Sequence, residues 1–280
     1  EKNEEMNDVA LFTCNFFSKI LSTTTRVMVF LPSPTSSESL NMSLDQLYAP
    51  GAPYPVLYLL HGMYGDETAW MRRTKIELYA QENGFAVVMP YGENGFYTDM
   101  AHGQRWFTYL TEELPRFMRR NFRISERRQD TFIAGLSMGG YGACKAALAN
   151  PDRYAAFASL SGAVDIEALA RSAAEQGVAR EAEDILGDLS CVKNSSADLL
   201  SLAETLKQSG QTPPPAYIAC GVDDTLCYPM NLHLKAGLEA LEYPMIFVQG
   251  PGKHEWRFWD QQIERAVLWF AELRENDSED

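Results

Sequence analysis

The stretch FIAGLSMGGYGACKAALA, residues 132–149, decides the fold. An apolar run ends at Leu136, a serine follows between two glycines in G-L-S-M-G, and small residues then continue in a helical pattern. Strand, sharp turn and helix in this order form the setting of a nucleophile elbow. Gly135 and Gly139 remove the side chains that would clash in such a turn, and backbone N–H groups at a helix N-terminus point at developing negative charge. Ser137 is therefore the candidate nucleophile; the alternative is a glycine-rich turn without chemistry.

The rest of the chain repeats this alternation of strand and helix. Apolar runs predict strands at residues 55–60, 85–90, 130–137, 157–162, 216–221 and 245–250. Helical windows lie near residues 68–82, 105–120, 138–149, 226–242 and 256–274. This order predicts an α/β fold with a mostly parallel central sheet and helices on both faces. We expect two leading strands within residues 16–32 to form an antiparallel edge, and the Ser- and Pro-rich residues 33–54 to form a surface loop.

One segment departs from the pattern. Residues 163–212 contain no good strand, are rich in Ala, Glu and Leu, and end in a QTPPP break. We interpret them as a helical insertion between two strands, which either caps the site or packs at the periphery. No linker divides the chain, so we expect residues 1–280 to form a single domain.

Composition limits the classes of partner. The 280 residues include 38 acidic and 24 basic side chains, which gives a formal net charge of -14. Such a surface repels phosphate backbones and anionic lipid, so we expect neither nucleic acid nor a membrane surface as partner. The charge also disfavours a highly anionic substrate unless the site is locally basic.

The cysteines and the N-terminus bear on the compartment. Five cysteines at wide spacings, with no C-x-x-C, predict free thiols in a reducing compartment and no zinc site, so we expect a cytoplasmic protein. The opening EKNEEMNDVA shows no secretory signal, although a cleaved one would leave no trace, and Met6 is an alternative native start. No run approaches 18 apolar residues, so no membrane span is expected.

The general base has few candidates, because the chain contains four histidines. In a strand–elbow–helix hydrolase the order along the chain is serine, acid, histidine. His61 and His102 precede Ser137 and fail that order, and His233 lies in the middle of a predicted helix. His254 follows the last predicted strand in the turn G-P-G-K-H-E-W and is the candidate base.

The acid is expected after the preceding strand, where the chain reads V-D-D-T-L. Its role is to accept the imidazole Nδ1–H, fix the tautomer and stabilise the imidazolium. Spacing does not choose between Asp223 and Asp224, one of which may serve as a helix N-cap.

Two backbone N–H groups are candidates for an oxyanion hole. One is that of Met138, directly after the nucleophile. The second is expected in H-G-M-Y-G, after the early strand at 55–60, where we select the N–H of Met63. A plain turn that closes the strand is the alternative.

Several motifs together resemble the esterase D family. They are H-G-M-Y-G-D-E-T-A-W-M-R-R-T, V-V-M-P, F-Y-T-D-M, E-E-L-P, F-I-A-G-L-S-M-G-G-Y-G-A, A-C-G-V-D-D-T-L and G-P-G-K-H-E-W. The resemblance runs from about residue 16 to about residue 270 and is greatest to bacterial tributyrin-esterase-type acetyl esterases. Related branches are S-formylglutathione hydrolases, feruloyl and acetylxylan esterases, and mycolyltransferases. The resemblance implies an α/β-hydrolase fold.

The resemblance also implies the roles of individual residues. The family's acid loop C-G-x-x-D-x-L falls on Cys220, Gly221, Asp224 and Leu226, which favours Asp224 over Asp223. The family nucleophile falls on Ser137, and the histidine of H-E-W falls on His254. Residues 163–212 match the family poorly.

These residues predict a serine carboxylesterase for short-chain acyl esters, including acetyl groups on sugars, or for hydroxycinnamoyl esters. The reaction would proceed through an acyl-enzyme and needs neither a metal nor an organic cofactor. The alternatives are an acyltransferase, a thioesterase like S-formylglutathione hydrolase, a peptidase and a non-enzymatic binding module. We expect a small ester, with acylated carbohydrate as one form of it, as partner, and a homo-oligomer is compatible with the sequence. Aromatic side chains that could line the substrate pocket, although such residues more often lie in the core, are Trp70, Phe96, Tyr97, Trp106 and Trp256.

Overall fold

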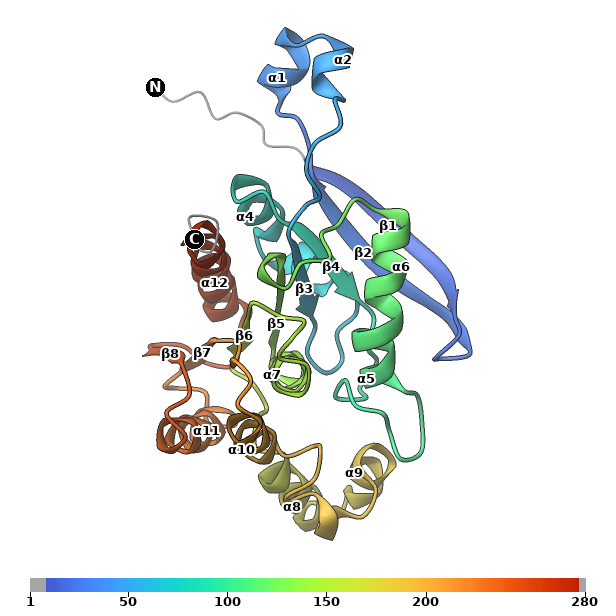
Figure 1. The fold of residues 1–280 in the computed structure, drawn as a ribbon. Helices are drawn as coiled ribbons and strands as arrows, with labels where there is room; N and C mark the ends of the chain where they lie inside the picture. The colour runs from blue at the N-terminus through green and yellow to red at the C-terminus, as the bar shows by residue number, and fades with distance from the viewer. Residues whose placement is uncertain (1–8, 277–280) are drawn as a thin grey trace.

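The computed structural model describes residues 9–276, and its centre is one eight-stranded sheet (Figure 1). The strands are β1 (Val9–Ser18), β2 (Thr23–Pro32), β3 (Val56–Leu60), β4 (Ala86–Pro90), β5 (Thr131–Leu136), β6 (Ala156–Leu160), β7 (Ala216–Gly221) and β8 (Met245–Gly250). They lie in the order β1-β2-β4-β3-β5-β6-β7-β8. The pairs β1–β2 and β2–β4 are antiparallel, and all other pairs are parallel. This is the mostly parallel sheet with an antiparallel edge that the alternation predicts.

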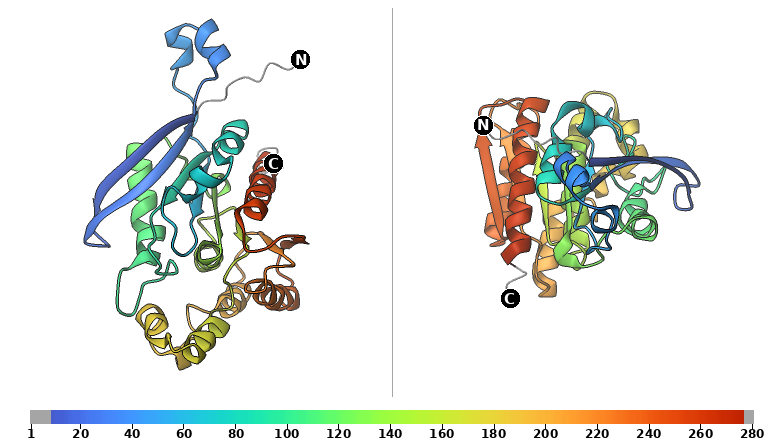
Figure 2. Two further views of the ribbon diagram at one scale, coloured as in Figure 1. Left: turned by 180° about the vertical axis from the view of Figure 1, so that it is seen from behind. Right: turned by 90° about the horizontal axis from the view of Figure 1, so that it is seen from above.

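Helices cover both faces of the sheet. One face carries α3 (Ala69–Arg73), α4 (Ile76–Glu82) and α12 (Trp256–Asn276). The other face carries α5 (Trp106–Thr108), the π-helical turn η1 (Tyr109–Glu113), α6 (Leu114–Asn121), α7 (Met138–Ala149) and α11 (Tyr228–Ala240). Seen from above, α12 runs along one side of the sheet (Figure 2).

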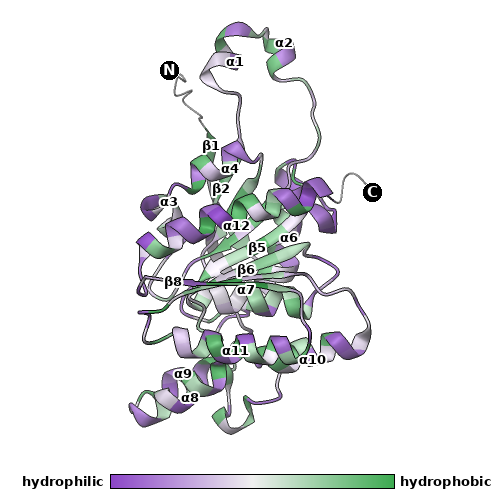
Figure 3. Ribbon diagram, turned by 90° about the vertical axis from the view of Figure 1, so that its left-hand side faces the viewer, coloured by the Kyte–Doolittle hydropathy of each residue, from purple (hydrophilic) through white to green (hydrophobic). Residues whose placement is uncertain are grey.

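The sheet is the core of the molecule, and its inner strands are apolar along their length (Figure 3). Every residue of β3, β4, β6 and β7 is buried. Successive side chains along a strand point to opposite faces of the sheet, so they enter two separate apolar clusters, one on each face. Each fully buried Leu, Val or Phe contributes roughly 1.5–3 kcal/mol to the free energy of unfolding, so this core holds the carboxyl ends of the strands firmly in place.

The N-terminal region differs in three respects from the sequence prediction. The leading hairpin begins at Val9 and not at Phe16. Residues 33–54 contain two short helices, α1 (Ser36–Asn41) and α2 (Leu44–Leu47), each begun by a capping box. The predicted helix at 68–82 is divided into α3 and α4, because the Thr74 hydroxyl bonds the Trp70 carbonyl at 2.7 Å and ends the first piece. The capping boxes T-S-S-E and S-L-D-Q are visible in the sequence, and they explain the second difference.

Residues 163–212 contain helices and no strand. These are α8 (Ile166–Glu175), α9 (Ala179–Leu186), the 3₁₀ turn η3 (Leu189–Cys191) and α10 (Leu199–Ser209). Helix α10 packs on α7, whereas α8 and α9 form the end of the molecule opposite to α1 and α2 (Figure 1). The carbonyl groups of Asp184 and Ile185 accept hydrogen bonds from the N–H groups of His102 and Ala101. The segment thus reaches across to the loop after β4.

Within residues 9–276, no helix combines the length and the apolar character that crossing a bilayer requires.

Candidate active site

Ser137 stands in a strained turn between β5 and α7. Its φ of 52° and ψ of -120° lie outside the regions that side-chain-bearing residues prefer. Its N–H donates to the Leu160 carbonyl at 3.0 Å, and its own carbonyl accepts from Ala163 N–H at 3.0 Å. A Cβ at Gly135 would clash with the backbone of Gly139, so the turn depends on glycine there. Such strain persists only where the surroundings enforce it, and it is common at nucleophiles.

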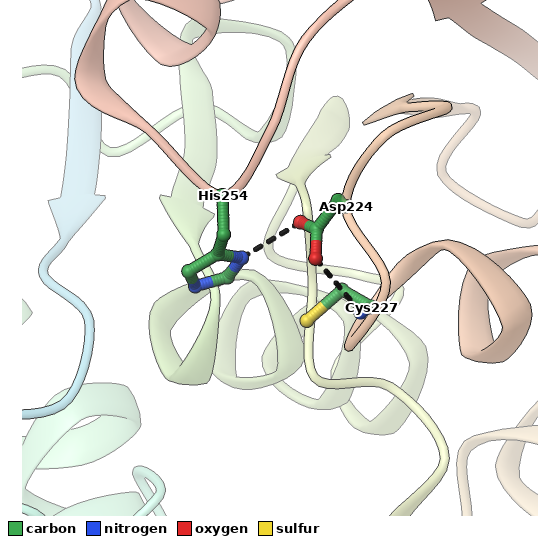
Figure 4. Close-up of side chains that lie close together, drawn as sticks. All are labelled: Asp224, Cys227 and His254. Atoms are coloured by element: carbon green, nitrogen blue, oxygen red, sulfur yellow. Dashed lines mark hydrogen bonds and ion pairs between the residues drawn. The ribbon is translucent and has the colours of Figure 1, made fainter.

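His254 and Asp224 form a hydrogen-bonded pair at the same edge of the sheet (Figure 4). Asp224 follows β7 and His254 follows β8, and 2.7 Å separates Asp224 Oδ2 from His254 Nδ1. The carboxylate is buried, with 1% of its side chain exposed, whereas the imidazole is 31% exposed. Because an ionised carboxylate only accepts hydrogen bonds, Nδ1 carries the proton and Nε2 is the nitrogen left to receive another.

The charge of Asp224 is maintained against burial. Burial acts to raise the pKa of its carboxyl, but the hydrogen bonds from His254 and from the Cys227 N–H outweigh it and hold the pKa below the ordinary value. The carboxylate therefore remains ionised at neutral pH, as the partner of an imidazolium must.

The two neighbouring aspartates have different positions. Asp223 Oδ2 accepts a hydrogen bond from Gly252 N–H at 3.3 Å, and Asp223 N–H donates to the Gly252 carbonyl at 3.0 Å. The loop after β7 and the loop after β8 are therefore joined through Asp223, while Asp224 contacts the imidazole. Of the two candidates that spacing leaves open, the structure brings Asp224 to His254.

Cys227 lies beside this pair (Figure 4). Ligand-type atoms of Asp224, Cys227 and His254 all lie within 4.8 Å of one another, a spacing that would suit a metal ion. Burial, and then the charge of Asp224, raise the pKa of the Cys227 thiol. Only a thiolate binds metal well, so this donor set fits an aspartate–histidine pair better than a metal centre.

A cavity of about 500 Å³ connects Ser137 with His254. In the described part of the chain no hydrogen bond joins the Ser137 hydroxyl to the imidazole, a looseness that is common before substrate binds. The lining residues come from the loop after β3, from α3, from the elbow and from the start of α12. They are Gly62, Met63, Tyr64, Gly65, Asp66, Thr68, Ala69, Arg72, Arg73, Leu136, Ser137, His254, Trp256 and Trp259.

The peptide between Gly62 and Met63 is held in a fixed orientation. Its carbonyl accepts hydrogen bonds from His61 Nδ1 at 2.7 Å and from Gly65 N–H at 3.1 Å. Because a trans peptide directs its N–H opposite to its carbonyl, the Met63 N–H points away from both donors. No acceptor among the described residues bonds this N–H, and Met63 lines the cavity. Met138 is the first residue of α7, where helix N–H groups have no partner within the helix.

His61 is the residue that fixes this peptide. Its ring is buried, and Nε2 accepts a hydrogen bond from the Gly92 N–H at 3.0 Å, so Nδ1 is the donor to Gly62. Burial lowers the pKa of His61 and keeps the ring neutral, which this pair of hydrogen bonds requires.

Of the five aromatic residues predicted for the pocket, Trp256 lines the cavity. The structure places the other four in the core: Trp70, Phe96, Tyr97 and Trp106. The loop after β4 folds inward instead of facing substrate, and the Tyr97 ring fills the space that Gly92 and Gly142 leave open.

The sequence reading missed part of the site. Arg72, Arg73 and Trp259 line the cavity, and the two arginines stand near the end of the quoted motif H-G-M-Y-G-D-E-T-A-W-M-R-R-T. The place of His61 directly before Gly62 is a signal for a role in positioning the loop. His233 lies on α11 and is exposed, as a mid-helix histidine would be.

Comparison with known proteins places this geometry in a family. The model of the esterase family, described as "Putative esterase", matches residues 18–270. The chain belongs to the esterase family. This esterase is 30% identical over 270 residues to an acetyl esterase of Caldicellulosiruptor saccharolyticus, a match that covers 95% of this chain and 99% of the relative.

Two solved structures from Staphylococcus aureus resemble the esterase closely. One is FphF, a fluorophosphonate-binding serine hydrolase, with 34% identity, a TM-score of 0.83, and coverage of 94% of this chain and 98% of that one. The other is the S-formylglutathione hydrolase FrmB, with 34% identity, a TM-score of 0.81, and coverage of 94% and 99%. The fold is that of an α/β-hydrolase of the esterase D type, as the motifs predict. The protein is a serine esterase, an enzyme that hydrolyses carboxylic esters.

Proposed function

We propose that Ser137, His254 and Asp224 form the catalytic triad of an esterase that hydrolyses short-chain acyl esters, acetyl esters above all. The observation that carries this proposal is the pairing of a buried carboxylate with an imidazole on the same cavity as a serine of positive φ. Each member follows a different strand, and the carboxyl ends of parallel strands are where α/β sheets bind ligands.

Acylation follows from the hydrogen-bond directions. Ser137 Oγ attacks the ester carbonyl carbon while its proton passes to His254 Nε2. Nδ1–H stays bonded to Asp224, whose negative charge stabilises the imidazolium. When the tetrahedral intermediate collapses, the C–O bond breaks and the alcohol leaves with the proton from Nε2. Water then attacks the acyl-enzyme by the same route and releases the acid.

The developing oxyanion would be bound by the N–H groups of Met63 and Met138. Donors that are already oriented cost no reorganisation during the reaction, and one such donor is worth about 10²- to 10³-fold in kcat. His61 supports this role as a positioning residue, because it orients the Gly62–Met63 peptide through its carbonyl.

The substrate class is supported by the similarity to an acetyl esterase over nearly the whole of both chains. We expect a small acyl group to bind next to Ser137 and Met63, which line the same cavity, with the alcohol in the rest of that cavity. An acylated sugar is one alcohol of this kind, and a panel of p-nitrophenyl esters from acetate to octanoate, together with sugar acetates and methyl ferulate, would rank the alternatives.

Ser137→Ala tests the nucleophile. Hydrolysis of p-nitrophenyl acetate should fall by at least about 10⁴-fold, because the Ser137 hydroxyl supplies the attacking oxygen of the proposed acylation step. The matched control is Ser37→Ala, at an exposed position on α1, which should keep wild-type activity. A fluorophosphonate probe should add its mass to Ser137 in the wild type and in the control. Activity of Ser137→Ala near the wild-type rate would disprove the assignment.

We also propose that the esterase works in the reducing cytoplasm. All five cysteines are free, and three of them are buried. Cell fractionation with an antibody against the native protein tests this location, and recovery from a membrane or extracellular fraction would contradict it.

A further inference from the structure

Two arginines of the cavity lack acidic partners. Within residues 9–276, the Arg72 side chain forms no ion pair or hydrogen bond. The Arg73 guanidinium forms none either and lies over the Trp256 ring, with Cζ 5.5 Å from the ring centroid. Both end α3 and line the cavity that contains Ser137 and His254. Arg26, by contrast, forms an ion pair with Glu67 at 3.0 Å.

The one carboxylate that lines the cavity does not neutralise them. Asp66 Oδ1 accepts hydrogen bonds from the N–H and the hydroxyl of Thr68, at 2.9 and 2.6 Å, and forms no ion pair with Arg72 or Arg73 within 4.0 Å. Among the described residues, two exposed guanidinium groups and one carboxylate therefore line the cavity. This local excess is opposite in sign to the net charge of -14 of the whole chain.

We propose that Arg72 and Arg73 make the cavity selective for esters that carry a carboxylate. The proposal rests on the proposed function, since it names the substrate class of the same site. A guanidinium group presents a planar fork of N–H donors that matches a carboxylate, and charge-assisted hydrogen bonds of this kind are stronger than neutral ones. The low-dielectric wall formed by Trp256 and Trp259 strengthens the attraction.

A purely structural role for these arginines makes a different prediction. Cations near a helix C-terminus stabilise the helix, and Arg73 also covers an indole ring. In that case substitution would lower the melting temperature without changing the preference between charged and neutral esters. The decisive quantity is therefore the ratio of kcat/KM values for a charged ester and its neutral counterpart.

The experiment uses two pairs of esters. In the pair 4-acetoxybenzoate and 4-acetoxybenzamide, the charge lies on the leaving group. In the pair 4-nitrophenyl hydrogen adipate and 4-nitrophenyl hexanoate, it lies on the acyl group. In Arg72→Gln/Arg73→Gln, the charged-to-neutral ratio should fall about tenfold for one pair, mainly through the KM of the charged ester. The pair that responds identifies the end of the substrate that the arginines bind.

Three controls separate charge from structure. Arg72→Lys/Arg73→Lys retains both charges and should retain most of the ratio. Arg120→Gln removes an exposed arginine of α6, outside the cavity, and should leave the ratio unchanged. Raising NaCl to about 0.5 M should move the wild-type ratio toward that of the glutamine variant, because salt screens the attraction.

The possible failures are distinguishable. Ratios within twofold of wild type for both pairs in the glutamine variant, with neutral esters still hydrolysed, would overturn this proposal alone. An equal fall in the lysine and glutamine variants would also overturn it, because charge would not be the determinant. Wild-type protein that hydrolyses no ester of either pair would instead contradict the proposed function.

Discussion

The esterase contains two histidine–aspartate pairs of nearly equal length, and their comparison shows what makes one of them suited to catalysis. His254 Nδ1 lies 2.7 Å from Asp224 Oδ2, and His233 Nδ1 lies 2.8 Å from Asp165 Oδ2. The first carboxylate is 1% exposed and the second 18%, and the imidazoles are 31% and 62% exposed. Distance alone therefore does not identify a catalytic pair.

The surroundings of the two pairs also differ: the Asp224–His254 pair lies at the cavity of Ser137, and the Asp165–His233 pair lies at the surface. Asp224 also accepts the Cys227 N–H and lies near the cavity of Ser137, so its charge is oriented and little screened. Asp165 Oδ1 accepts the Ala168 N–H and so caps α8, and its imidazole partner faces solvent. One pair can stabilise a proton transfer, whereas the other ties the start of the helical insertion to α11.

The largest difference between the pairs should appear in activity. Asp224→Asn should lower kcat for p-nitrophenyl acetate by about 10³- to 10⁴-fold, because an amide cannot hold the Nδ1–H tautomer or stabilise the imidazolium. Asp165→Asn should change kcat by less than about twofold. Steady-state kinetics on both variants measures the contrast.

A third variant completes this test. Asp223→Asn keeps an oxygen that can accept the Gly252 N–H and should lose far less activity than Asp224→Asn. A greater loss at residue 223 than at residue 224 would reverse the assignment of the acid.

A smaller effect is expected on stability as a function of pH. Because the pKa of Asp224 is lowered in the folded state, its contribution to the free energy of unfolding is fully present above the ordinary value of 3.8. That contribution is lost as the pH falls through the lowered pKa. The difference in free energy of unfolding between wild type and Asp224→Asn should therefore be larger at pH 6 than at pH 3, as urea titrations would measure. A difference that stays constant or grows toward pH 3 would contradict the lowered pKa.

The smallest effect is expected at the exposed pair. His233→Ala should change the free energy of unfolding by less than about 1 kcal/mol, because solvent weakens a side-chain contact of this exposure. Its effect should decrease further in 0.5 M NaCl, with activity unchanged. Thermal unfolding at the two salt concentrations gives the comparison, and a loss of several kcal/mol would mean that this pair is as closely integrated as the buried one.

The sequence predicted the parts of this molecule that depend on local patterns. The six strands from β3 to β8 follow from apolar runs such as VLYLL, and the elbow follows from Gly135 and Gly139 around Ser137. The two aspartates at 223 and 224 marked the position of the acid, but their spacing could not distinguish them. That choice depends on which side chain reaches the imidazole of His254, a contact between residues 30 positions apart.

Other features depend on long-range packing and were not predictable from local patterns. The aromatic loop after β4 has the composition of a pocket wall, yet Tyr97 and Trp106 turn into the core. Gly92 and Gly95 in the same loop, and Gly142 on α7, leave room for these rings. Conversely, Arg72 and Arg73 look like ordinary helix-end cations until the fold places them beside Ser137. Whether residues 163–212 cap the site was also left open, and none of them lines the cavity at Ser137.

The loops after β7 and β8 are bonded to each other, and these bonds affect how the residues of the site can move relative to one another. Val222 N–H bonds the Gly250 carbonyl at 2.9 Å, Asp223 and Gly252 bond each other twice, and a side chain at Gly221 would collide with Gly252. His254 and Asp224 therefore stand on two loops that are bonded to each other, while Ser137 stands on the separate turn between β5 and α7. A joint shift of these two loops relative to the elbow would change the distance between Ser137 and the imidazole, but it would leave the bond between His254 and Asp224 intact.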